Sequence, residues 1–110
     1  MAKLLKEMKC IGCEGGIEPL SVERAKELLT QTPEWQLAAD NKSISKTFIF
    51  KGFGKTMLFV NAVAWIANQE GHHPDLQVSF DRCTVNFTTH AVQGLTDNDF
   101  ICAAKVDALL

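Results

Sequence analysis

The sequence predicts an α+β fold in which a four-stranded antiparallel sheet is covered on one face by three helices. Three observations lead to this prediction. Four segments alternate apolar and polar residues like strands, three segments have helical periodicity, and together they follow the order α-β-β-α-β-β-α. Strands that bury one face and follow one another in pairs are typical of an antiparallel sheet with helices on one side.

Composition indicates one folded domain. The chain has 110 residues, of which 46% are hydrophobic and 22% are charged, and these proportions are typical of a globular protein. Residues 1–20 have no clear period and contain glycines and a proline, so we expect an N-terminal arm there. Residues 21–110 are then expected to form a single domain around one core.

The first helix is expected to begin after Ser21, a good N-cap residue, and to end near Thr30. After it, residues 35–38 and 43–50 alternate like strands on either side of a turn at residues 40–42. This pattern predicts the first pair of strands.

The central helix is predicted over residues 53–70, because Gly71 can adopt the left-handed cap and Pro74 cannot continue the turn. Leu58 and Trp65 are seven residues apart and form a second apolar stripe. That stripe could contact a partner subunit or, equally, a neighbouring helix of the same chain. The broad face expected to pack on the sheet consists of Phe53, Met57, Val60, Val63, Ala64 and Ala67, widened by Phe59 and Ile66.

The second pair of strands is predicted over residues 76–80 and 84–88. Cys83 falls in the connection between them. We expect Phe80, and Trp35 of the first pair, to lie in the core rather than to stack on a ligand.

The last helix is predicted to run from its N-cap, Thr96, to about Leu109. Asp99 stands three residues after Thr96, which is the spacing of a capping box. We therefore expect a structural role for this carboxylate, and any role in a functional site would be additional.

The three histidines of the chain provide the main functional signal. His72 and His73 lie in the loop that follows the central helix, and His90 follows the last predicted strand. A hairpin of the last two strands would return His90 towards the other two. Histidine changes charge near neutral pH, so it can move protons in either direction. A solvated loop would explain an isolated pair, but the clustering favours a site.

A zinc site is the main competing interpretation, because three neutral imidazoles can hold a catalytic zinc with one position open. Adjacent histidines do not easily turn both rings onto one ion. The neighbouring carboxylates of Glu70 and Asp75 are expected to be solvated. We therefore expect acid–base chemistry with no metal and no cofactor.

The four cysteines give a weaker signal. Cys10 and Cys13 have the spacing of half a zinc knuckle, and Cys83 and Cys102 do not supply a second pair. A redox motif would need a strand-to-helix junction. We expect Cys10 and Cys13 to be reduced thiols in a mobile arm.

Charge and hydropathy argue against two classes of partner. The net charge of -2 provides no basic surface for nucleic acid. No apolar run approaches the ~20 residues of a membrane helix, and the first residues do not resemble a signal peptide. We expect no nucleic acid and no membrane as partners, and a cytoplasmic protein.

Four sequence elements, in matching order and spacing, carry a family resemblance: His72-His73-Pro74, Phe80, Thr88-Thr89-His90, and Leu95-Thr96-Asp97-Asn98-Asp99. With these elements the chain resembles the pterin-4a-carbinolamine dehydratase family, also known as dimerisation cofactors of a homeodomain transcription factor. The resemblance covers about residues 21–110. It implies an α+β sheet covered by helices, and a homodimer or homotetramer assembled through helices.

The resemblance also implies a reaction. The substrate would be a 4a-hydroxytetrahydropterin left by an aromatic amino acid hydroxylase, a possible partner. Loss of the 4a-hydroxyl as water would give quinonoid dihydropterin, without a metal or redox cofactor. By the resemblance His73 is the principal acid–base residue, and His72 and His90 bind the pterin and assist proton transfer.

Further roles follow from the same resemblance. Gly71, Thr88 and Thr89 would contact the pterin, and Asp99 would support the histidines. One position departs: four residues before His72 the family commonly has glutamate, and this chain has Asn68. An amide can form hydrogen bonds but supplies no negative charge. We expect activity to survive with altered substrate affinity.

A function of another class remains open: a non-catalytic module, similar to a transcriptional coactivator, that binds a partner protein through its helices. Leu58 and Trp65 would provide the surface for it, although oligomerisation explains them equally well. The three histidines favour the enzyme, because an adaptor does not need them.

Overall fold

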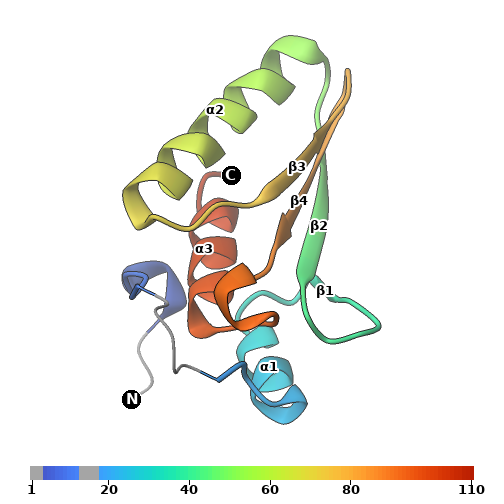
Figure 1. Ribbon diagram of the computed structural model, residues 1–110. Helices are drawn as coiled ribbons and strands as arrows, with labels where there is room; N and C mark the ends of the chain where they lie inside the picture. Colours follow the sequence, from blue (N-terminus) through green and yellow to red (C-terminus); the bar gives the residue numbers. More distant parts are fainter. Residues whose placement is uncertain (1–3, 13–17) are drawn as a thin grey trace.

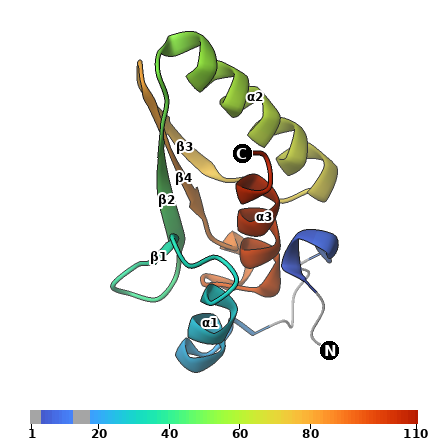
Figure 2. The same ribbon diagram turned by 180° about the vertical axis from the view of Figure 1, so that it is seen from behind.

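The computed structural model describes residues 4–12 and 18–110. Its helices α2 and α3 lie side by side on one face of a four-stranded sheet, and α1 lies at the end of this layer, against α3 (Figures 1 and 2). The α+β class and the element order α-β-β-α-β-β-α, both predicted from sequence, are confirmed.

The sheet is antiparallel throughout and has the strand order β1-β2-β4-β3. Both predicted strand pairs form, and β2 and β4 join them in the middle of the sheet. An Asx turn links the first pair, in which the Lys42 N–H donates to Asp40 Oδ1 at 3.0 Å. The strands are β1 (Gln36–Leu37), β2 (Ile44–Ile49), β3 (Asp75–Val78) and β4 (Arg82–Phe87).

The helices begin and end close to the predicted residues because their caps were recognisable. Ser21 caps α1 by accepting a hydrogen bond from the Arg24 N–H, and Thr96 and Asp99 form the predicted capping box of α3. The bounds are α1 (Val22–Leu29), α2 (Phe53–Glu70) and α3 (Asp97–Asp107), with short 3-10 turns η1 (Leu5–Glu7) and η2 (His90–Val92).

One hydrophobic core lies between the sheet and the helices. Trp35 is 2% exposed, as predicted, and its ring contacts Phe48 and Phe87. The Phe59 ring of α2 packs on Phe48, with ring centres 4.6 Å apart. Residues 98–104 and Val106 of α3 are buried, so α3 is enclosed by the sheet and the other helices.

The face of α2 that packs on the sheet is rotated from the predicted one. Thr56, Phe59, Val63 and Ala67 are its buried residues, whereas Phe53 is 56% exposed. Ala64 is also exposed. The helix is apolar on most sides, so periodicity alone did not select the buried face.

Two predictions for the second strand pair were wrong. Phe80 is 68% exposed rather than in the core, because β3 ends at Val78 and Phe80 lies in the turn. Cys83 pairs with Val78 inside the sheet and is fully buried, rather than lying between the strands. The first error comes from ending β3 two residues too late, and the second from starting β4 two residues too late.

The N-terminal arm packs against the domain where it is described. Leu5 belongs to the hydrophobic core with 3% exposure, and its N–H donates to Gln31 Oε1 at 3.0 Å. Cys10 is not in a loose segment, because its Sγ lies 3.5 Å from Cys102 Sγ on α3. Cys10 is a free thiol, and Cys13 lies outside the described residues.

Within the described residues, no helix is both long and apolar enough to cross a membrane.

Candidate active site

The three histidines line one hollow of about 260 Å³ at the end of α2. The chain segments around it come from four parts of the sequence: the arm, the cap of α2, the residues after β4, and the start of α3. Its lining residues are Ile11, Gly12, Glu70, Gly71, His72, His73, Thr88, Thr89, His90, Ala91 and Asn98. Six of the predicted site residues are among them.

The end of α2 positions the histidine pair. Gly71 adopts the left-handed conformation, with a φ of 65°, and caps the helix as predicted. The His72 N–H still donates to the Ala67 carbonyl at 3.2 Å. Because β3 begins at Asp75, the two imidazoles lie on a short, fixed connection between a helix and a strand.

A buried carboxylate holds His72. Asp99 is fully buried, and its Oδ1 lies 2.6 Å from His72 Nε2. Its Oδ2 accepts hydrogen bonds from the Thr89 hydroxyl at 2.7 Å and from the Thr96 N–H at 3.0 Å. With Asp99 ionised, Nε2 carries the proton that it donates, so Nδ1 is the ring nitrogen left for a substrate.

The His72 ring is also fixed by packing. It stacks on the buried Phe87 ring at an interplanar angle of 11°, with ring centres 6.0 Å apart. His72 itself is 9% exposed. The ring therefore has one orientation, set by an aromatic neighbour on its face and by Asp99 at its edge.

The other two histidines are exposed within the same hollow. His73 follows the cap of α2, and His90 begins the turn η2, two residues after Thr88. The hairpin of β3 and β4 brings His90 back to the histidine pair, as the sequence predicted. Thr89 is buried and connects this segment to Asp99.

Two of the predicted site residues do not line the hollow: Asp99, which binds His72, and Asn68. Asn68 is exposed on α2 and is not among the lining residues. Its predicted effect on substrate affinity stays a prediction.

Several lining residues were missed from sequence. Glu70, expected to be solvated, is only 10% exposed, and its Oε1 accepts the Cys10 N–H at 2.8 Å. Asn98 contacts the arm at Ile11, on the backbone N–H and carbonyl. No periodicity or motif indicates these contacts, because their partners lie 60 and 87 residues apart in the chain.

Two cysteine thiols have a pKa above the usual range. A hydrogen bond with Cys102, burial and the nearby Glu70 carboxylate raise the pKa of the Cys10 thiol far above its usual range. Burial also raises the pKa of Cys83. Over residues 4–12 and 18–110, no histidine, cysteine and carboxylate side chains form a group of three or more that could hold a metal ion.

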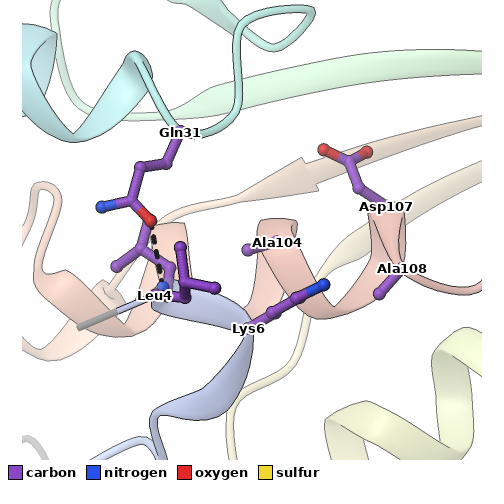
Figure 3. A pocket seen from close by; sticks show the side chains of 7 residues that line it. Leu4, Lys6, Gln31, Ala104, Asp107 and Ala108 are labelled. Atoms are coloured by element: carbon purple, nitrogen blue, oxygen red, sulfur yellow. Dashed lines mark hydrogen bonds between the residues drawn. The ribbon is translucent and has the colours of Figure 1, made fainter.

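A larger hollow, of about 370 Å³, lies between η1 and the end of α3 (Figure 3). Gln31 and Lys6 border it on one side, and Asp107 and Ala108 on the other. None of the three histidines lines it. We place the candidate site in the smaller hollow, because proton-transferring side chains gather there.

The fold and this hollow define a class of protein: an α+β protein with three histidines gathered in one hollow between a helix cap and a sheet. Comparison with known proteins identifies the family within this class. Residues 18–109 match the family model of pterin 4 alpha carbinolamine dehydratase. The chain belongs to this family, as the sequence motifs predicted.

Individual relatives agree with the family model. A protein of Nitrosomonas eutropha assigned as a pterin-4-alpha-carbinolamine dehydratase is 58% identical over 96% of this chain and 93% of its own. One from Legionella pneumophila (strain Corby), assigned likewise, is 52% identical over 100% of this chain and 98% of its own. The predicted enzyme class, a hydro-lyase of this family, is thereby confirmed.

Two solved structures share the fold. The crystal structure of a transcriptional coactivator/pterin dehydratase from Brucella melitensis matches with a TM-score of 0.80 and 28% identity, over 84% of this chain and 98% of that one. A pterin dehydratase-like protein identified as a RuBisCO assembly factor in the alpha-carboxysome matches with a TM-score of 0.61 and 22% identity, over 69% and 88%. The second likeness concerns the fold alone.

Proposed function

We propose that this chain removes water from a 4a-hydroxytetrahydropterin to give the quinonoid dihydropterin. The C4a–O bond breaks, the 4a-hydroxyl takes up a proton and leaves as water, and N5 loses its proton as the double bond to C4a forms. One proton is donated and one is accepted, so the step is neutral overall. General acid–base groups are sufficient for both transfers.

The observation that carries this proposal is the shared hollow of His72, His73 and His90, with His72 bound to the buried Asp99. A flat ring that must gain a proton at one atom and lose one at a neighbouring atom needs proton-transferring groups on the same side of a pocket. Family membership names the ring as a pterin.

The histidines are assigned different roles by their surroundings. His73 is exposed in the hollow, so its ring can exchange protons with both substrate and solvent, and we assign it as the principal acid–base residue. His72 is held by Asp99 and Phe87, which suits a group that binds the ring in a fixed orientation. His90 binds from the opposite segment and assists proton transfer.

The backbone and hydroxyl groups around the histidines bind the pterin edges in this proposal. Gly71 allows close approach because it has no side chain. Thr88 and Thr89 contact the pterin from the segment after β4. Asp99 acts through His72 and Thr89 without contacting substrate.

In the cell, the substrate must come from a reaction that hydroxylates a tetrahydropterin at C4a. We assign that supply to an aromatic amino acid hydroxylase, and infer that the enzyme works beside it in the cytoplasm.

We also infer a homodimer or homotetramer. Leu58 and Trp65 on α2 are 70% and 64% exposed, and no helix of the described chain covers them. Large apolar side chains at helical spacing on one face are typical of a surface that a partner covers. A second copy of the chain would bury this stripe.

The test is the dehydration of freshly generated 4a-hydroxytetrahydropterin by protein purified without an affinity tag and washed with a chelator. Wild type should accelerate the loss of water, and His73→Ala should lower kcat by ~100-fold or more, the typical contribution of a general acid–base residue. Gln77→Ala, at an exposed position of β3 outside the hollow, serves as control and should retain wild-type kinetics.

Two results would contradict the proposal. No acceleration by wild type would reject the enzyme and favour the protein-binding module. Stoichiometric metal after the chelator wash, together with loss of activity when it is finally stripped, would favour a metal site at the three histidines.

A further inference from the structure

The N-terminal arm supplies part of the wall of the hollow. Ile11 and Gly12 line it together with the histidines. They precede residues 18–109, the part of the chain that matches the family model, so the family pattern assigns them no role. We call residues 10–12 the arm segment.

The arm segment is clamped through its backbone. The Ile11 N–H donates to Asn98 Oδ1 at 3.0 Å, and Asn98 Nδ2 donates to the Ile11 carbonyl at 2.6 Å. One amide side chain thus satisfies both backbone groups of one residue, as a neighbouring strand would. The Cys10 N–H donates to Glu70 Oε1 at 2.8 Å.

The clamping residues adjoin the residues that hold the histidines. Asn98 is 6% exposed and directly precedes Asp99, which binds His72. Glu70 directly precedes Gly71, the cap of α2. The same two segments therefore fix both the histidine pair and the arm segment, so the position of one is tied to the position of the other.

Cys10 packs against the core at Cys102, but core packing does not explain why Ile11 and Gly12 are held at the hollow. Ile11 is 77% exposed although its backbone is fixed at both polar groups. A Cβ added at Gly12 would meet nothing within 4 Å. Ile11 and Gly12 thus present one aliphatic side chain and one open space at the rim of the hollow.

We propose that the arm segment is a substrate-binding wall: the Ile11 side chain packs on the bound pterin, and Gly12 leaves the space that the ring system needs. Asn98 and Glu70 are positioning residues that hold the wall. A pterin has polar edges and flat apolar faces, so histidines and threonines suit its edges and an aliphatic side chain suits its face. This inference rests on the proposed function.

The test compares two glycine-to-leucine variants. Gly12→Leu fills the open space at the rim, whereas Gly54→Leu adds the same side chain in open space at the start of α2. The two ends of this 18-residue helix are about 27 Å apart, so Gly54 is remote from the site. Gly12→Leu should raise KM by ~10-fold, a loss of binding of about 1.4 kcal/mol, with little change in kcat. Gly54→Leu should keep the wild-type KM.

Binding of biopterin, a stable pterin, is measured in parallel by titration calorimetry. Its Kd should rise with KM in Gly12→Leu only. Equal KM and Kd values for Gly12→Leu and wild type would contradict the proposal that the arm segment is a substrate-binding wall. If Gly12→Leu fails to fold, Gly12→Ala replaces it, with a smaller rise expected in both constants.

Asn98→Ala tests the positioning role. The Ile11 amide loses its acceptor, so its hydrogen exchange should become faster, and KM and Kd should rise while kcat changes less. Faster exchange with unchanged KM and Kd would mean that Asn98 only secures the arm, and would overturn its positioning role.

The two proposals fail in different ways. A wild-type chain that binds biopterin but does not accelerate dehydration rejects the proposed reaction. The biopterin Kd values of wild type and Gly12→Leu then still test whether the arm segment is a substrate-binding wall. If the wild type is active and Gly12→Leu has the same KM as wild type, only the proposal for the arm segment is rejected. A wild type that neither turns over substrate nor binds biopterin rejects both.

Discussion

Asp99 links the folding of α3 to the site. Its Oδ2 completes the capping box with the Thr96 N–H, while its Oδ1 binds His72 at 2.6 Å. From sequence, the capping role was expected, and support of the histidines was implied only by family resemblance. One carboxylate can do both because its two oxygens point to different partners. The three partners satisfy a fully buried carboxyl group, which would be costly to leave without hydrogen bonds.

Asp99→Asn removes the charge but keeps the size of the side chain. We expect kcat to fall by roughly 10- to 100-fold, because His72 loses the acceptor that fixes its proton on Nε2. Stability should fall by about 1.5–3 kcal/mol, since hydrogen bonds to a charged group are lost. The pH dependence of kcat and urea unfolding measure the two effects. Asp97→Asn, on the same helical turn, is the control, and it should lower kcat and stability less than Asp99→Asn does. An unchanged pH profile would contradict the role at His72.

At the scale of elements, the end of α2 decides where the histidine pair lies. The helix stops because Gly71 takes the left-handed conformation, and β3 begins four residues later. A one-residue extension of α2 would rotate His72 by ~100° about the helix axis, away from Asp99. The cap therefore fixes the register between helix and site.

Gly71→Ala tests this cap. A Cβ meets no neighbour there, but φ is 65°, so the cost is conformational, at about 1–2 kcal/mol. We expect a lower unfolding free energy together with reduced activity. Gly54→Ala, in ordinary helical backbone with open space, should instead stabilise by up to ~1 kcal/mol. Denaturant unfolding and kcat/KM of both variants provide the comparison; equal stabilities would contradict the argument.

At the scale of the whole molecule, α2 has two apolar sides. One side packs on the sheet through Phe59 and Val63, and the other exposes Leu58 and Trp65. A helix apolar on both sides is expected between two layers, and this chain supplies only one of them. The missing layer is the basis for proposing a second subunit.

Replacing Leu58 and Trp65 together by lysine should dissociate the proposed oligomer, because two charges would then be buried against the partner. Light scattering and sedimentation measure the mass. Leu110→Lys, at a position that is 74% exposed, adds charge outside the stripe and should leave the mass unchanged. A wild-type protein that is monomeric at all concentrations would contradict the inference.

The sequence predicted the fold because its local signals were explicit. Ser21, Thr96 and Gly71 marked helix ends by cap chemistry, and alternating strands on both sides of short turns indicated antiparallel pairs. The buried face of α2 and the start of β4 were predicted wrongly. Neither is marked locally, since an apolar helix has several possible faces and a strand can begin at either end of a short turn.

For the site, the sequence by itself determined the family and predicted which side chains carry the chemistry, because the family motifs and the three histidines are visible in the order of residues alone. Only the tertiary structure decided which other residues line the hollow. It placed the arm at Asn98 and Glu70, and it left Asn68 outside the hollow. The physical reason is the separation of the interacting residues along the chain, because helix caps and strand alternation depend on neighbours only a few residues away. A hydrogen bond between residues 11 and 98 depends on how every element between them packs.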